Sequence, residues 1–252
     1  MPQQFRIYEF RSPDNNGGSN FKDKIVEYLP KIGIFIIVLL LFSVFGNSWA
    51  SLLEKLLFMP ILIASLVLHE LSHAYMANFL GDPTPRLTGR LSLNPLKHLD
   101  LWGTLLFIFC GFGWAKPVQV TASNFRKPDK AMASVAIAGP LCNFFLAILA
   151  AFVYKICGYF SNNVNFLEIM YYICISSSLY NLMLAIFNLL PIPPLDGSRL
   201  VHYMLPAQYK AKYYQFSQQY SIIIFLLVFM YAGKMIGPIA LDLTKSLWSL
   251  II

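Results

Sequence analysis

Leu68-His69-Glu70-Leu71-Ser72-His73 lies within an apolar stretch that continues to Leu80. Residues four apart face the same side of a helix, so the two imidazoles can reach one ion. Two such histidines with an adjacent glutamate are typical of a zinc site with a general base. One ionisable side chain costs at least ~2.5–3.5 kcal/mol at the centre of a membrane helix, so three together indicate a functional site.

The composition predicts an all-α polytopic membrane protein. Of the 252 residues, 57% are hydrophobic and only 12% are charged, whereas soluble domains have about 25% charged residues. Such a chain has too little polar surface to cover a soluble core. The net charge of +7 is interpreted as cytoplasmic anchoring charge and not as a nucleic-acid surface. The four cysteines contain no C-x-x-C pair, so we expect free thiols.

Apolar segments predict about five to six transmembrane helices. The tail, residues 221–252, forms either two spans in a hairpin or one span and an interfacial helix. Residues 1–30 lack an early apolar run, so we expect a flexible cytoplasmic arm and no cleavable signal. Residues 31–252 then form the membrane-embedded domain. The predicted spans before the tail are about 32–45, 56–80, 131–154 and 169–195.

The basic residues predict the orientation of the chain. If the N-terminus is cytoplasmic and the spans alternate, fifteen of the nineteen Lys and Arg residues face the cytoplasm. They lie in residues 1–31, 81–130 and 197–219. Cytoplasmic loops of membrane proteins carry such an excess, which supports a cytoplasmic N-terminus.

The loop 81–130 is expected to be structured. Residues 87–93 and 118–121 alternate apolar and polar side chains, which predicts two short half-buried strands. Between them, residues 101–113 are apolar but too few to span a bilayer. We therefore expect a small membrane-associated β-hairpin with a re-entrant or interfacial segment.

A catalytic zinc ion needs a third protein ligand. The extended motif of one soluble class would place it at position 79, where this chain has Phe79. Asp196 is the best remote candidate, because it ends the fourth span near the side on which the second span exits. The prolines before it would let its loop dip to the depth of His73. The alternative is that Asp196 is a turn residue before Gly197.

Glu70 lies about 100° round the helix from His69, so it cannot easily be a third ligand. It can instead reach a water on the metal. Zinc lowers the pKa of such a water toward ~7, and a carboxylate can then take its proton. Glu70 can later deliver this proton to the leaving amine of a peptide bond.

Asn143 and Asn188 lie in predicted membrane helices, where an amide needs hydrogen-bond partners. If they face the zinc cavity, they could hold the substrate backbone or the developing oxyanion. Hydrogen bonding between helices is an equal alternative. Gly139-Pro140 is predicted to be a helix-packing and kinking element.

Five motifs occur in order: HELSH (69–73), GRLSLNP (89–95), GWAKPV (113–118), AGPLCN (138–143) and NLLPIPPLDG (188–197). Together, over roughly residues 55–200, they resemble the site-2 protease family of intramembrane zinc metalloproteases. The resemblance implies a three-helix catalytic core and one zinc ion held by His69, His73 and Asp196, with Glu70 as base. It also implies cleavage of transmembrane substrates near the cytoplasmic side, here in a compact form without a PDZ or CBS domain.

The expected function is hydrolysis of peptide bonds within membrane-spanning proteins, in the cytoplasmic membrane of a prokaryote. The expected partners are transmembrane protein substrates and the lipid bilayer, without nucleic acid; the oligomeric state is left open. Two alternatives are a zinc-binding membrane transporter and a non-proteolytic scaffold. In a transporter, Glu70→Gln would disturb transport and leave no proteolysis to lose. A scaffold would have no need of the four polar residues His69, Glu70, His73 and Asp196.

Overall fold

Helices make up most of the chain between residues 49 and 252. The computed structural model describes residues 33, 49–104 and 115–252. Met1–Asn47 and Ser48–Ile252 form separate units, and the description below concerns the second. The long helices are α2 (Trp49–Phe79), α5 (Pro128–Phe160), α6 (Val164–Asn188) and α8 (Ala207–Ile251). The short ones are α3 (Thr84–Leu87), η1 (Pro95–Lys97), η2 (Ala122–Asn124) and α7 (Gly197–Met204).

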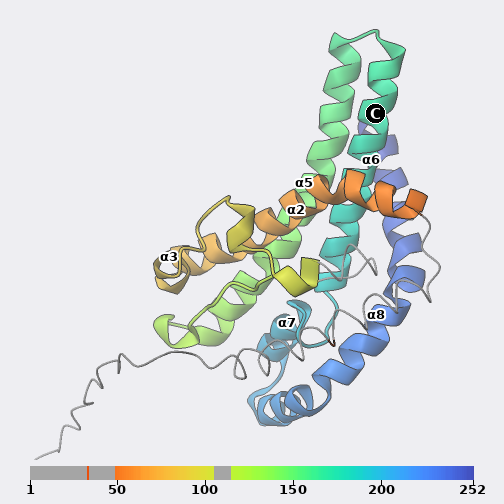
Figure 1. The fold of residues 1–252 in the computed structure, drawn as a ribbon. Coiled ribbons are helices and arrows are strands. Elements are labelled where there is room, and N and C mark those ends of the chain that lie inside the picture. Colours follow the sequence, from red (N-terminus) through yellow and green to blue (C-terminus); the bar gives the residue numbers. More distant parts are fainter. Residues whose placement is uncertain (1–32, 34–48, 105–114) are drawn as a thin grey trace, which may run out of the picture. The chain divides into compact units, whose positions relative to one another are not determined.

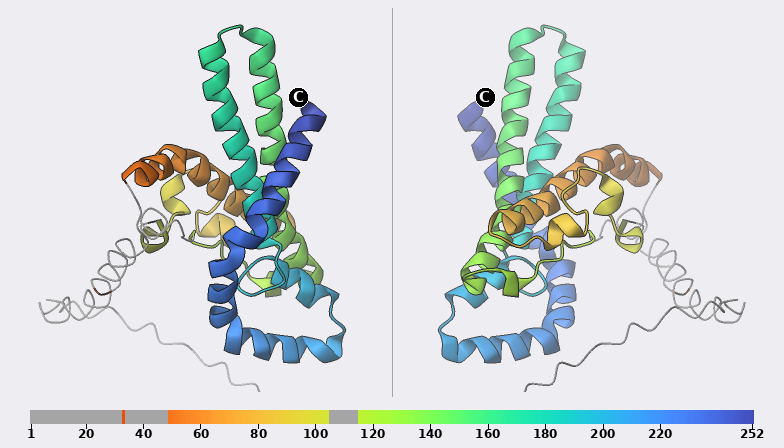
Figure 2. Two further views of the ribbon diagram at one scale, coloured as in Figure 1. Left: turned by 90° about the vertical axis from the view of Figure 1, so that its right-hand side faces the viewer. Right: turned by 90° about the vertical axis from the view of Figure 1, so that its left-hand side faces the viewer.

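The core of the unit is a crossing of three helices. Helices α5 and α6 run antiparallel and lie side by side, joined by a short turn (Figures 1 and 2). Helix α2 packs across both of them, with its larger contact on α5. The last part of α8 packs along α6, as the two turned views in Figure 2 show. The histidine motif on α2 therefore lies against two neighbouring helices.

Three of these helices are long and apolar enough to cross a membrane: Leu56–Phe79, Pro128–Phe160 and Val164–Asn188. Their outer surfaces carry large exposed apolar side chains, such as Phe145 at 62% exposure and Phe160 at 81%. Outward apolar side chains on helices of this length suit a lipid environment. The predicted all-α, multi-pass membrane class is confirmed in the described part of the chain.

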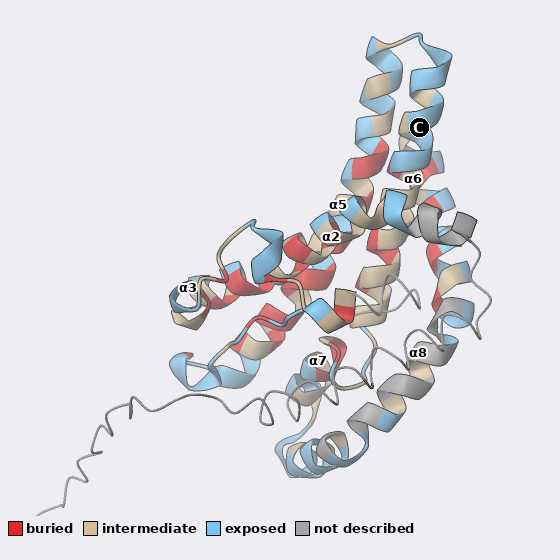
Figure 3. Cartoon of the chain, in the orientation of Figure 1, coloured by how far each residue is buried: buried red, intermediate tan, exposed pale blue. Residues whose placement is uncertain are grey.

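Small side chains allow the close approach of the helices. Figure 3 shows that buried residues concentrate where α2, α5 and α6 meet, while the far ends of α5 and α6 are largely exposed. Ala74, Ala77, Ala136 and Ala147 are completely buried. Lipid supplies little hydrophobic force between helices, so such interfaces depend on close van der Waals packing of small residues. The short side chains of α2 and α5 thus bring the polar residues of the site within reach.

The ends of two predicted segments differ from expectation. Helix α6 ends at Asn188 and does not continue to residue 195, because Pro191 lacks a backbone donor and restricts the residue before it. The tail is one continuous helix, α8, so the hairpin alternative is wrong. The predicted arm 1–30 and span 32–45 lie outside the described residues, except for residue 33.

The prediction of two strands in the loop 81–130 is wrong for the described residues. Residues 87–93 contain the end of α3 and then Gly89 at a φ of +69°, a conformation that a regular strand does not contain. Residues 118–121 are not paired in a ladder. The described part of the loop has one isolated antiparallel bridge, between Leu99 and Ala115. Most of the expected re-entrant segment falls in residues 105–114, outside the described residues.

The alternation of apolar and polar side chains in residues 87–93 does not reflect a strand. Arg90 is buried, and its guanidinium donates hydrogen bonds to the backbone carbonyls of Lys97 and Lys116. The Lys116 amide in turn donates to the carbonyl of His98 at 2.7 Å. A polar residue in this stretch therefore points inward and holds the two sides of the loop together.

A buried carboxylate joins the end of α2 to the segment that leads into α5. Asp82 is fully buried and accepts hydrogen bonds from the Thr84 amide at 3.0 Å and hydroxyl at 2.6 Å. It also accepts from the Thr121 amide at 2.8 Å and the Asn124 side-chain amide at 2.6 Å. Burial alone would raise the pKa of Asp82, but these donors outweigh it and lower the pKa. The carboxylate thus fixes the loop that lies over the histidine motif.

We predict that Asp82→Asn lowers the free energy of unfolding at pH 7 by ~1–3 kcal/mol, because an amide group would face donors. The contribution of Asp82 is complete above its unfolded pKa of about 3.9. It is lost as the pH falls through the lower folded pKa. Denaturant unfolding in detergent at pH 7 and at pH 3 should show a difference between the two proteins that shrinks in acid. Asp242→Asn, at an exposed position of α8, is the control; an equal effect of both variants would contradict the prediction.

Candidate metal centre

The two histidines of α2 face each other across one helical turn. His69 Nε2 and His73 Nε2 lie 3.0 Å apart. The exposed fractions of the two residues are 5% and 7%. Neutral imidazole nitrogens at this spacing can share one metal ion.

Asp196 completes a three-membered cluster. After α6 ends, the proline-containing turn returns the chain, and Asp196 precedes the first residue of α7. Its Oδ2 lies 3.2 Å from His69 Nε2 and 3.1 Å from His73 Nε2. Gly197 is required by this turn, because a Cβ there would lie 2.2 Å from the Leu189 carbonyl oxygen.

The geometry of the cluster fits a zinc ion. Two ligands of a tetrahedral zinc with bonds of about 2.0–2.1 Å are separated by about 3.3 Å, close to the observed 3.0–3.2 Å. The buried Oδ2 of Asp196 has no hydrogen-bond partner among the described residues and faces the two Nε2 atoms. Two imidazoles and one carboxylate are one of the donor sets found in catalytic zinc sites.

Each imidazole is held from behind by an acceptor. His69 Nδ1 lies 2.5 Å from Asn143 Oδ1, and His73 Nδ1 lies 2.7 Å from the backbone oxygen of Val135. Both acceptors require the hydrogen on Nδ1, which leaves the lone pair of Nε2 directed toward Asp196. Such outer partners fix the orientation of metal-ligating histidines.

Asn143 belongs to a buried polar network that extends to α6 and back to α2. Its Nδ2 donates to Asn181 Oδ1 at 2.8 Å. Asn181 Nδ2 donates to Ser65 Oγ and to the Ser177 carbonyl, both at 2.9 Å. Asn181 and Ser65 belong to none of the sequence motifs that suggested a role, although an amide in lipid needs hydrogen-bond partners at Asn181 as well.

Glu70 lies beside the cluster and contacts the loop after the undescribed segment. The backbone amide of Val118 donates to Glu70 Oε2 at 3.0 Å. Val118 itself is buried. This amide was not recognised in the sequence, because a backbone donor leaves no signature in residue type. The contact holds one oxygen of the carboxylate and leaves Oε1 for other partners.

Helix α5 passes the histidines at very close range. A Cβ at Gly139 would lie 2.5 Å from His73 Nε2 and 2.6 Å from His69 Nε2. Gly139 is buried and precedes Pro140, which lies inside the helix. The absence of a side chain at position 139 therefore makes room for the Nε2 atoms of both histidines.

Asn188 lies apart from the cluster in its hydrogen bonding. Its Nδ2 donates to the Leu184 carbonyl of its own helix at 3.0 Å, and the residue is half-buried. Of the six residues singled out in the sequence, the structure links His69, His73, Asp196 and Asn143 directly. Glu70 is their neighbour on α2, and Asn188 makes no hydrogen bond to them in the described part of the chain.

We predict that Gly139→Ala weakens zinc binding about tenfold or more, because its methyl group would displace both imidazoles from their positions. Gly158→Ala, on the same helix with open space around its Cβ position, should bind zinc as the wild type does. Competition with a chromophoric chelator on the purified protein measures both. Equal zinc affinity of the two variants would be the contrary result.

The chain is similar to known proteins over most of its length. The model of Peptidase family M50 matches residues 57–171 and 159–232. A Bacillus subtilis protein, named as a candidate zinc metalloprotease, is 41% identical over 178 residues, 67% of this chain and 78% of that protein. A zinc metalloprotease of Methanocaldococcus jannaschii is 30% identical over 178 residues, 70% of this chain and 41% of that protein. No solved structure gives a significant match.

The matched residues include the whole cluster. His69, His73 and Asp196 all fall within the part of the chain that the family model covers. That part is well over half of the chain, and the Bacillus relative is 41% identical over 67% of the chain. The chain therefore belongs to peptidase family M50, the site-2 protease family.

Proposed function

We propose that this protein is an intramembrane zinc endopeptidase that hydrolyses peptide bonds in transmembrane segments of other proteins. One zinc ion per chain is held by His69, His73 and Asp196. The observation that carries the proposal is the convergence of three possible ligand atoms within 3.2 Å, on two buried histidines and a half-buried aspartate. The names of the relatives support zinc as the metal.

A zinc ion, when bound, supplies a Lewis acid that polarises the peptide carbonyl and acidifies water. Glu70 is the general base that accepts a proton from the attacking water and passes it to the leaving amine. The hydrogen bond from the Val118 amide to Oε2 fixes the carboxylate, so that Oε1 is the oxygen that exchanges the proton. An acceptor at the Nδ1 of each imidazole leaves the lone pair of its Nε2 available to a metal ion.

The two asparagines take different parts in this proposal. Asn143 is completely buried, with both ends of its amide engaged, so it orients His69. Asn188 is half-buried, and the structure describes a partner only for its Nδ2. We assign to Asn188 the binding of the substrate backbone or of the developing oxyanion.

The proposed topology has five to six spans and a cytoplasmic N-terminus. Residues 31–252 form the membrane domain, and about 55–200 form its catalytic core. The excess of Lys and Arg on one side of the described spans supports this orientation. The bacterial and archaeal relatives support a prokaryotic cytoplasmic membrane.

We expect about one zinc per chain in the detergent-purified wild type and in Glu70→Gln, and a large loss in Asp196→Ala. Glu70→Gln should abolish proteolysis of a membrane reporter, because an amide cannot accept the proton. Metal analysis and reporter cleavage on the same preparations test this. Zinc retained in Asp196→Ala would remove it from the ligand set, and full proteolysis by Glu70→Gln would remove the base. A protein that binds zinc but never cleaves would favour the transporter alternative.

The buried cluster also predicts a substrate preference. A peptide bond within a helix is shielded, and the ligands are recessed between α2, α5 and α6. The substrate helix must open locally before its carbonyl can reach them. We expect transmembrane reporters with Gly, Pro or Asn near the cut to be cleaved about tenfold faster than a Leu-rich reporter, which is equivalent to ~1.4 kcal/mol in the barrier. Quantified cleavage products decide this, and equal rates would oppose the requirement for unwinding.

A further inference from the structure

We propose that Asn181 is a positioning residue that sets the tautomer of His69. It acts through Asn143, which lies between the two in the hydrogen-bond network. This inference deepens the proposed function and rests on it. The two histidines are held in different ways. The Nδ1 partner of His73 is a backbone carbonyl, which can only accept a hydrogen bond. The partner of His69 is a side-chain amide, which could turn over and present its NH₂ group instead.

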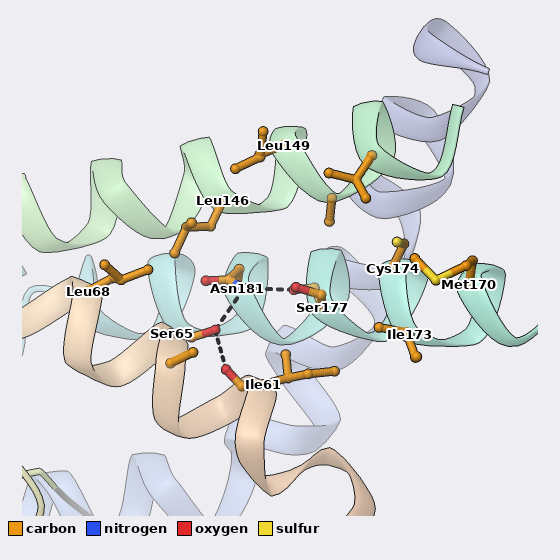
Figure 4. Close-up of a pocket in the computed structure, with 13 residues that line it drawn as sticks. Ile61, Ser65, Leu68, Leu146, Leu149, Met170, Ile173, Cys174, Ser177 and Asn181 are labelled. Atoms are coloured by element: carbon orange, nitrogen blue, oxygen red, sulfur yellow. Dashed lines mark hydrogen bonds between the residues drawn. The ribbon is translucent and has the colours of Figure 1, made fainter. Parts of the chain in front are cut away.

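The direction of the network is fixed at its far end. Asn181 lies between groups from its own helix and from α2, as Figure 4 shows. Its amide faces the carbonyl of Ser177 at 2.9 Å, and a carbonyl accepts only from the NH₂ group. The same NH₂ group donates to Ser65 Oγ, because the Ser65 hydroxyl already donates its own hydrogen to the Ile61 carbonyl at 2.8 Å. Two backbone carbonyls thus determine which way Asn181 points.

The orientation is then transmitted to the metal ligand. With its NH₂ group so engaged, Asn181 presents Oδ1 to Asn143, which must answer with Nδ2 at 2.8 Å. Asn143 then presents Oδ1 to His69 Nδ1. This acceptor keeps the hydrogen on Nδ1, so Nε2 has its lone pair free for the metal.

Because the network is buried, reversing either amide would be costly. Asn143 and Asn181 are 0% and 1% exposed. If either amide turned over, two donors or two acceptors would meet without water, and an unsatisfied buried polar group costs ~1–3 kcal/mol. Without Asn181, Asn143 Nδ2 keeps only the Ser65 carbonyl at 3.5 Å. No other contact in the described part of the chain then favours one orientation of the Asn143 amide over the other.

The test compares Asn181→Leu with Ser178→Ala, a buried position on the same helix that bonds Ala147 and Trp248 and does not contact the network. Zinc affinity is measured by chelator competition. Metal-free protein labelled with ¹⁵N-histidine reports the tautomer above pH 8, and His69→Ala assigns the signal among the four histidines. We expect Asn181→Leu to bind zinc about 10–100-fold more weakly and to lose the uniform Nδ1–H state of His69. Ser178→Ala should leave both unchanged.

A rescue variant separates positioning from packing. Adding Asn143→Asp to Asn181→Leu should restore zinc affinity to within a few-fold of the wild type, because both oxygens of a carboxylate accept and no orientation is needed. Failure of this rescue, or wild-type affinity in Asn181→Leu, overturns the inference. So does an Nε2–H tautomer of His69 in the metal-free wild type, an outcome that does not depend on the folding of Asn181→Leu. Loss of zinc in Asp196→Ala would meanwhile leave the proposed function standing, whereas a wild type without zinc would remove both.

Discussion

The close approach of two imidazole nitrogens and one carboxylate oxygen in an apolar helix bundle constrains the structure around them. Two imidazoles and a carboxylate converge to within 3.2 Å, where lipid offers no solvation. To permit this, α5 must pass without a side chain at Gly139, and α6 must stop early enough for Asp196 to return. The small residues of the helix interfaces and the proline-containing turn are therefore parts of one arrangement.

The side chains of the cluster are oriented by two kinds of hydrogen-bond partner, namely backbone groups and side-chain amides. The Val135 carbonyl and the Val118 amide belong to the backbone, so their polarity is fixed by the fold. Asn143 and Asn181 are side-chain amides whose polarity depends on their neighbours. His69, which is held by a side-chain amide, therefore needs a longer series of hydrogen bonds behind it than His73, which is held by a backbone carbonyl.

Much of this architecture follows from the sequence, and the exceptions have physical reasons. The spacing of His69 and His73, with Glu70 between them, is a local property of one helix, and long apolar runs mark the helices themselves. Asp196 was singled out because it ends the fourth predicted span near the side on which the second span exits, and because the prolines before it would let its loop dip toward His73. The strands predicted at 87–93 and 118–121 failed because a two-residue alternation cannot tell an inward arginine such as Arg90 from an outward one. Asn181 and the Val118 amide acquire their roles only through contacts between distant segments.

The loop between α2 and α5 is closed twice, once at Asp82 with Thr121 and again where His98 meets Lys116. The inner closure encloses residues 99–115, and the outer one also encloses Val118, whose amide bonds Glu70 on α2. Doubling the length of such an enclosed segment costs only ~0.6 kcal/mol in closure entropy. A change of length between residues 99 and 115 should therefore alter the free energy of folding little and leave His69, His73 and Asp196 in place.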